Sequence, residues 1–181
     1  LPKECLLMDP IDIAEIMSES ESISYCPYLY GFSNYSRKGF KKNIITYNDV
    51  MDLSGKGPFG THLGGTGIAV SSKSKNKDYA MEYAYWIASS ECQKNIYYKN
   101  GGQPGNAKAW EDSEINHETN NFFNNTRKTL ERSWVRPKHN GYMNFQDSGG
   151  DTINEYLDKS IETIKVYEKL KSEYRKSFKD E

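Results

Sequence analysis

Apolar residues recur at helical spacing in several stretches of the chain. The longest stretch is 152–178, where apolar side chains three and four positions apart form one face. Its members are Ile153, Leu157, Ile161, Ile164, Tyr167, Leu170 and Tyr174. Similar spacing predicts helices over 77–88 and 116–133, and Asp9-Pro10 opens a short helix over about 10–17. A further helix over 91–99 is expected to stop at Asn100-Gly101-Gly102, since a left-handed residue commonly ends a helix.

Other stretches have the pattern of strands or loops. Residues 23–35 alternate partly with period two and are rich in aromatics, which predicts a strand broken at Pro27. Residues 44–47 are a short strand candidate, and 68–70 are expected to form a short buried strand after the glycine-rich loop 55–67. Residues 139–146 are interpreted as a loop. The mixture predicts the α/β class, with this chain a helix-rich α+β fragment.

Composition narrows the function classes. The 181 residues suit one domain or slightly more, and 24 aromatics (14 Tyr, 7 Phe and 3 Trp) argue against disorder. A net charge of −1 disfavours a nucleic-acid binder, which needs clustered positive charge. No apolar run reaches the roughly 18–20 residues of a membrane helix, and no signal peptide opens the chain. Because the chain starts at Leu1, we expect a processed product or an excised piece.

Metal, redox and phosphate chemistry find little support. The histidines His62, His117 and His139 form no HExxH or i,i+4 pair. Cysteines at 5, 26 and 92 give neither a CxxC pattern nor an even-numbered disulfide framework, although one pair could bridge. The GGTG run at 64–67 is no phosphate loop, because it leads into the predicted strand. It is either a tight turn with close backbone approach or a turn that faces a ligand. No cofactor is expected.

The aromatic run 25–35 is the most informative segment. Tyr28, Tyr30, Phe32 and Tyr35 alternate with small or polar residues that include Asn34. Such rings could stack on the apolar faces of sugars while amides and hydroxyls bind the ring hydroxyls, or they could simply form core. For the tryptophans at 86, 110 and 134 core packing is expected.

Several motifs then line up in order along the chain. They are YCPYLYGFSNYSR at 25–37, LGGTGIAVS at 63–71, WIASSECQ at 86–93, GGQPG at 101–105, Ala109-Trp110, Arg136-Pro137 and Gly141-Tyr142. This succession resembles the C-terminal part of an extracellular solute-binding protein of the sugar-type family 1, the receptor of an ABC importer. The resemblance covers roughly residues 25–157.

The resemblance implies a two-lobed periplasmic-binding-protein type II fold with the ligand between the lobes. Residues 1–66 would belong to the second lobe, 67–134 to the first, and 135–181 to the return into the second. The ligand would be a carbohydrate or related polyol, and the partners would be the transmembrane subunits of a permease. The protein would lie at the extracellular face of the membrane or in the periplasm, held by an anchor absent from this chain. Most of the first lobe is also absent, so a fragment is expected.

The resemblance also implies a set of ligand contacts. They are Tyr28, Tyr30, Asn34, Tyr35, Gly64, Gly65, Thr66, Gly102, Gln103, Arg136 and Tyr142. Two alternatives stay open. One is a carbohydrate hydrolase, which needs two carboxylates across a cleft; Asp112 and Glu114 lie on a polar turn and nothing singles them out. The other is a truncated domain that binds no sugar.

Overall fold

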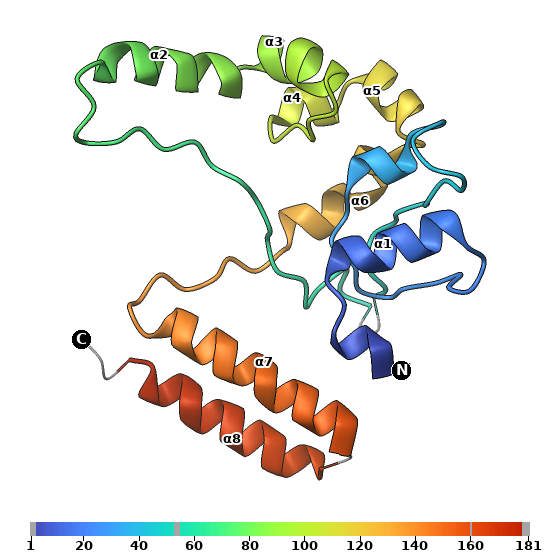
Figure 1. The fold of residues 1–181 in the computed structure, drawn as a ribbon, viewed down its shortest axis with the longest axis vertical. Coiled ribbons are helices and arrows are strands. Elements are labelled where there is room, and N and C mark those ends of the chain that lie inside the picture. Colours follow the sequence, from blue (N-terminus) through green and yellow to red (C-terminus); the bar gives the residue numbers. More distant parts are fainter. Residues whose placement is uncertain (1–2, 53–54, 160, 179–181) are drawn as a thin grey trace. The chain divides into compact units, whose positions relative to one another are not determined.

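The computed structural model describes residues 3–52, 55–159 and 161–178. It is helix-rich, with 53% of residues helical and almost no strand. Two compact units divide the chain: a large unit of residues 10–134, and a small unit of residues 1–9 and 135–181. Figure 1 labels the helices. The elements of the large unit are α1 (Pro10–Glu19), η2 (Ser33–Ser36), α2 (Lys77–Ala88), α3 (Ser90–Cys92), η3 (Gln93–Tyr97), α4 (Ala107–Trp110), α5 (Ser113–Glu118) and α6 (Phe122–Glu131), and those of the small unit are η1 (Lys3–Leu6), α7 (Tyr142–Lys159) and α8 (Thr163–Lys176).

The three predicted strands are wrong. Across the described ranges, β pairing is limited to two isolated bridges, Lys38 with Lys41 and His62 with Trp134. Within 44–47 the side chains do alternate, with Ile45 and Tyr47 buried, but no neighbouring strand offers the ladder that defines a sheet. Residues 68–70 are not buried either, since Ile68 is 54% exposed. The α/β expectation thus reduces to a helix-rich fold.

Two of the predicted helices agree closely with the structure. Helix α2 spans the predicted residues 77–88, and α3 with η3 covers most of 91–99. Gly101 has a φ of +87°, and the Gly102 N–H donates to the carbonyl of Tyr97 at 2.9 Å. The stop signal therefore works as predicted, through a left-handed glycine just past the helix.

The helix predicted over 116–133 is instead two helices, α5 and α6. Asn120 and Asn121, with φ of 52° and 59°, are left-handed and separate them. Asparagine adopts this conformation more readily than most residues, because its short polar side chain can bond locally. The Asn121 N–H donates to the carbonyl of Asn116 at 2.7 Å and closes the turn. The apolar spacing was correct, but the backbone break within it was missed.

Aromatic rings on α6 form the centre of the large unit's core. Phe122 and Phe123 are nearly inaccessible, and their ring centroids lie 5.0 Å apart. Phe123 packs edge-on against Trp110 at 5.0 Å, while Phe122 packs against Tyr47 at 5.1 Å. Edge-to-face pairs at these distances are favourable beyond the area they bury. Ala14 on α1 belongs to the same cluster and is fully buried.

The small unit is a helical hairpin, so the helical stretch predicted over 152–178 is divided between two helices, and the loop predicted over 139–146 is wrong from Tyr142 on. Helix α7 begins at Tyr142 and ends at Lys159, and α8 begins at Thr163 (Figure 1). The ring of Phe145 packs on that of Tyr174 at 5.1 Å. One long amphipathic helix would leave its apolar face in water, whereas two antiparallel helices cover each other's. No helix among the described residues is long and apolar enough to cross a membrane.

Candidate ligand-binding surface

Three exposed rings meet on the large unit, and we call Tyr30, His62 and Trp134 the aromatic cluster. The ring centroids of Tyr30 and His62 lie 6.1 Å apart, and those of His62 and Trp134 lie 6.3 Å apart, both edge-to-face. Tyr30 is 42% exposed and Trp134 is 50% exposed, and His62 is exposed as well. A surface of this kind can stack on the apolar face of a flat ligand.

Backbone pairing holds His62 beside Trp134. The Leu63 N–H donates to the carbonyl of Trp134, and the Trp134 N–H donates to the carbonyl of Thr61, both at 2.9 Å. The hydroxyls of Thr61 and Ser133 lie 3.1 Å apart and add a third contact. Two segments about 70 residues apart in sequence are thereby joined at one short bridge, which orients both rings.

Gly64 lets Tyr30 join this cluster. A Cβ at Gly64 would lie 2.8 Å from Cε1 of the Tyr30 ring, so a larger residue would displace the ring. Close approach is therefore the role of this first glycine. Gly65 and Thr66 are exposed, and a Cβ at Gly65 would meet only open space. Close approach thus explains Gly64, whereas a turn that faces a ligand stays a prediction for Gly65 and Thr66.

Asn34 and Gln103 join the segment 31–34 to the loop after η3. The Gln103 side chain accepts from the Ser33 N–H at 2.7 Å through Oε1, and its Nε2 donates to the carbonyl of Gly31 at 3.1 Å. The Asn34 Nδ2 donates to the carbonyl of Gly101 at 3.0 Å. Gly102 lies against the ring of Tyr97, where a Cβ would come within 2.5 Å. These predicted contact residues therefore have a structural role, because their contacts hold the loop after η3 in place.

Tyr35 and Tyr28 have opposite environments. Tyr35 belongs to the core, and its hydroxyl donates to Glu15 Oε1 at 2.6 Å. Lys41 binds the other oxygen of Glu15 at 2.6 Å, and the bonds from Lys41 and Tyr35 lower the pKa of the Glu15 carboxyl. Tyr28 is largely exposed. Of the predicted aromatic wall, Tyr28 and Tyr30 therefore have accessible rings, and Tyr35 does not.

Arg136 and Tyr142 belong to the small unit. The Arg136 Nη1 donates to Gln146 Oε1 on α7 at 3.0 Å. Tyr142 is buried, with its ring centroid 5.7 Å from His139 and 6.0 Å from Phe145. Within this unit both residues contribute to the packing around the start of α7.

Sequence reasoning missed His62 and Trp134 as members of a surface. His62 was considered only as a metal ligand, and Trp134 was expected in the core. Trp110 is buried as expected and donates from Nε1 to the carbonyl of Pro104 at 2.7 Å, whereas Trp86 is exposed on α2. The one sequence feature that pointed to His62 was its place between Gly60 and Gly64, directly before the segment that carries the resemblance.

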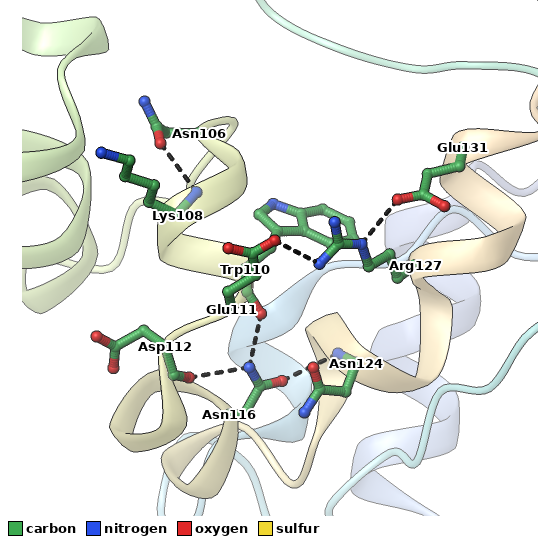
Figure 2. Close-up of polar contacts among 9 residues, drawn as sticks. All are labelled: Asn106, Lys108, Trp110, Glu111, Asp112, Asn116, Asn124, Arg127 and Glu131. Carbon is green, nitrogen blue, oxygen red and sulfur yellow. Dashed lines mark hydrogen bonds and ion pairs between the residues drawn. The ribbon is translucent and has the colours of Figure 1, made fainter.

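Polar residues around α4, α5 and α6 form a second group, shown in Figure 2. Asp112 caps α5 by accepting from the N–H groups of Glu114 and Ile115, each at 3.1 Å. The bond from Lys94 at 2.6 Å, with these backbone bonds, lowers the pKa of Asp112. Asn116 donates to the carbonyls of Trp110 and Asp112, and its Oδ1 accepts from the Asn124 N–H at 2.9 Å. These contacts tie three short helices together.

Two pockets lie away from the aromatic cluster, and the side chains that could bind a metal ion are not grouped together in the part of the chain that the structure describes. Pockets of about 590 and 380 Å³ are present on the large unit, and neither is lined by the aromatic cluster. Over the ranges that the structure describes, no three His, Cys, Asp or Glu side chains are placed to hold a metal ion. Cys5, Cys26 and Cys92 are free thiols, so the one bridge that the sequence allowed is not formed.

The comparisons with known proteins add no relative. No protein-family model matches the chain, and neither a curated protein nor a solved structure was found to match it. The local geometry of the aromatic cluster and the sequence motifs are therefore what any functional proposal has to rest on.

Proposed function

We propose that this chain is part of the substrate-binding component of an ABC transporter and binds a carbohydrate or related polyol on the aromatic cluster. The observation that carries the proposal is the group of exposed rings of Tyr30, His62 and Trp134, held by backbone bonds beside residues 64–66. Tyr30 and residues 64–66 belong to the motifs that resemble family 1 solute-binding proteins.

The chemistry of the cluster suits a sugar. The C–H face of a pyranose ring is apolar and flat enough to stack on an indole, while its hydroxyls need donors and acceptors. Trp134 offers the stacking face, and the hydroxyl of Tyr30 and the ring nitrogens of His62 offer hydrogen bonds. The exposed Gly65 and Thr66 add backbone groups and a hydroxyl within the same short segment.

Transport would follow from closure of two lobes over the bound ligand. The proposal places the cluster where the two lobes of a type II periplasmic-binding-protein fold would meet, beside the interlobe cleft. Ligand contacts made in the closed form shift the population toward it, and the permease subunits would recognise that form. The protein would act at the extracellular face of the membrane or in the periplasm, without a cofactor and without catalysing a reaction.

A ligand screen with two matched tryptophan variants tests this proposal. The wild-type chain is screened by thermal shift and tryptophan fluorescence against mono-, di- and oligosaccharides and polyols, since a ligand of the folded state raises the melting temperature. Trp134→Ala is expected to weaken binding of the selected sugar at least tenfold, which equals about 1.4 kcal/mol. Trp86→Ala removes another exposed tryptophan of the large unit, outside the cluster, and is expected to bind normally.

Far-ultraviolet circular dichroism establishes that both variants are folded. The proposal fails if no compound of the panel shifts the wild-type melting temperature, or if Trp86→Ala weakens binding as much as Trp134→Ala. Release of hydrolysed sugar during the screen would instead favour a carbohydrate hydrolase.

A further inference from the structure

Helix α2 is joined to the rest of the large unit at its C-terminal end. Gln93 Nε2 donates to the carbonyl of Ile87 at 2.8 Å, and Asn106 Nδ2 donates to the carbonyl of Ala88 at 3.1 Å. Along its whole length the helix buries no residue. The large rings that it carries therefore contribute little to the core, and their presence on α2 needs another explanation.

Three of these rings lie along one side of α2, and we call Tyr79, Tyr83 and Trp86 the aromatic stripe. They stand at positions i, i+4 and i+7, which a helix brings within a rotation of about 60° around its axis. These residues are between 42% and 78% exposed. The rings of Tyr83 and Trp86 contact each other, with centroids 5.7 Å apart. The stripe is thus an exposed aromatic surface about two helical turns long.

Three lysines gather at the start of α2. Lys73, Lys75 and Lys77 are exposed, and residues 71–77 contain no acidic side chain. Among the residues that the structure describes, none of the three lysines forms an ion pair. Their position does not stabilise the helix, because the positive N-terminal end of a helix disfavours cations. The three charges are therefore available to an anionic surface.

Two acidic side chains lie beside the aromatic stripe. Asp78 and Glu82 stand one position before Tyr79 and Tyr83, so each is rotated by about 100° from the tyrosine that follows it. Glu82 also stands three positions after Tyr79 and four before Trp86, which sets it at the border of the stripe. The stripe itself carries no charge, and Glu82 is the acidic residue of α2 that opposes an anionic surface most directly.

We propose that α2 binds the surface of an anionic lipid bilayer, with the aromatic stripe in the interfacial layer and the three lysines against the lipid phosphates. Tyr and Trp suit this layer, because each combines an apolar ring with a polar group that stays in contact with water. Basic side chains add attraction to anionic lipids, so the rings and the lysines act together. A bilayer requires no matching groove, and neither of the two pockets is lined by α2.

Co-sedimentation with lipid vesicles tests the proposal, which does not rest on sugar binding. The wild-type chain is expected to bind vesicles of phosphatidylcholine and phosphatidylglycerol in equal parts about tenfold more tightly than vesicles of phosphatidylcholine alone. Tyr83→Ala is expected to weaken this binding about fivefold. Tyr85→Ala is the matched control, because Tyr85 is 70% exposed and lies on the opposite side of the same helix. Circular dichroism checks that both variants keep the wild-type helix content.

Charge variants test the part played by the lysines. Replacing both Lys73→Gln and Lys75→Gln is expected to remove most of the preference for phosphatidylglycerol, whereas Lys73→Arg with Lys75→Arg is expected to keep it. Glu82→Gln is expected to strengthen binding, because it removes the negative charge at the border of the stripe. A preference that the two glutamines leave unchanged overturns the assignment of the lysines to the lipid phosphates.

Hydrogen exchange detected by mass spectrometry locates the contact. With anionic vesicles the amides of α2 are expected to exchange more slowly, since a helix held at the interface opens less often. Slower exchange confined to α8, which is also rich in lysine, overturns the assignment to α2. The proposal as a whole is overturned if the wild-type chain binds neither kind of vesicle, or if Tyr85→Ala weakens binding as much as Tyr83→Ala.

Discussion

Helices α6 and α2 belong to the same unit but differ sharply in how much they bury. In α6, Phe122 and Phe123 are 2% and 0% exposed and pack against Tyr47 and Trp110. Helix α2 is two residues longer and buries no residue at all. Its Tyr83 and Trp86 rings contact each other, with centroids 5.7 Å apart, and remain exposed.

The difference shows that two sources of stability maintain these helices. Helix α6 is held by the core, since helical stability in proteins comes mainly from packing of one face. Helix α2 depends on local terms, namely alanines, long side chains and an aromatic pair at i,i+3. An isolated helix of its length is marginal in water, so α2 is expected to open locally far more often than α6.

The largest expected effect comes from truncating the centre of the core. Phe123→Ala should lower the free energy of unfolding by about 3–5 kcal/mol, because a fully buried ring is replaced by a cavity. Trp86→Ala on α2 should change it by less than about 0.5 kcal/mol, because little burial is lost. Urea denaturation followed by circular dichroism measures both, and equal effects would contradict the contrast between α6 and α2.

The second-largest loss of stability is expected at Asn116, whose buried side-chain amide joins α4, α5 and α6. Asn116→Ala removes two donated bonds and one accepted bond, and it leaves the Asn124 N–H and two carbonyls without this partner. The expected loss is about 2–3 kcal/mol. Asn100→Ala is the control, because that amide is exposed and its bond goes to the carbonyl of Ile96 within its own helical turn. Urea midpoints that coincide for the two variants would show that this network contributes little.

The same glycine substitution should act differently in the two helices. Asn125→Gly in α6 is expected to lower the global free energy of unfolding by somewhat less than 1 kcal/mol, while Ala84→Gly in α2 costs about 1 kcal/mol of local helix stability. Because α2 opens on its own, Ala84→Gly should speed amide exchange in α2 and leave the melting temperature nearly unchanged. Hydrogen exchange detected by mass spectrometry separates these outcomes, and a lower melting temperature for Ala84→Gly would link α2 to the core.

The smallest expected effect is a loss of folding stability at acid pH through Asp112. Bonding to Lys94 and to backbone N–H groups lowers the folded-state pKa of Asp112. The stabilisation is therefore fully present above its unfolded pKa of about 3.9 and is lost as the pH falls through the lowered folded value. Asp112→Asn keeps the cap without the charge, so it should remove this acid dependence and cost up to about 1 kcal/mol at neutral pH. Unfolding curves recorded between neutral and acid pH check the sign.

Sequence patterns located α2 and its boundaries because its apolar and small residues run without interruption, and they located the stop at Gly101 because few residues other than glycine suit a left-handed position. The resemblance named Tyr30 and Gly64 separately among the ligand contacts, and in the structure Gly64 lies against the Tyr30 ring. Each of these features depends on neighbours along the chain, or on motifs that the sequence itself contains.

Other features depended on contacts between distant segments, and only the tertiary structure decided them. The strands predicted at 23–35, 44–47 and 68–70 did not form, because a strand exists only where another pairs with it. The long C-terminal stripe folded back on itself, because that buries more apolar surface than one straight helix. Trp134 reached His62 through a bridge across about 70 residues, which no local pattern encodes. Local propensity thus determined individual helices and stops, while long-range pairing decided which side chains are buried and which form a surface.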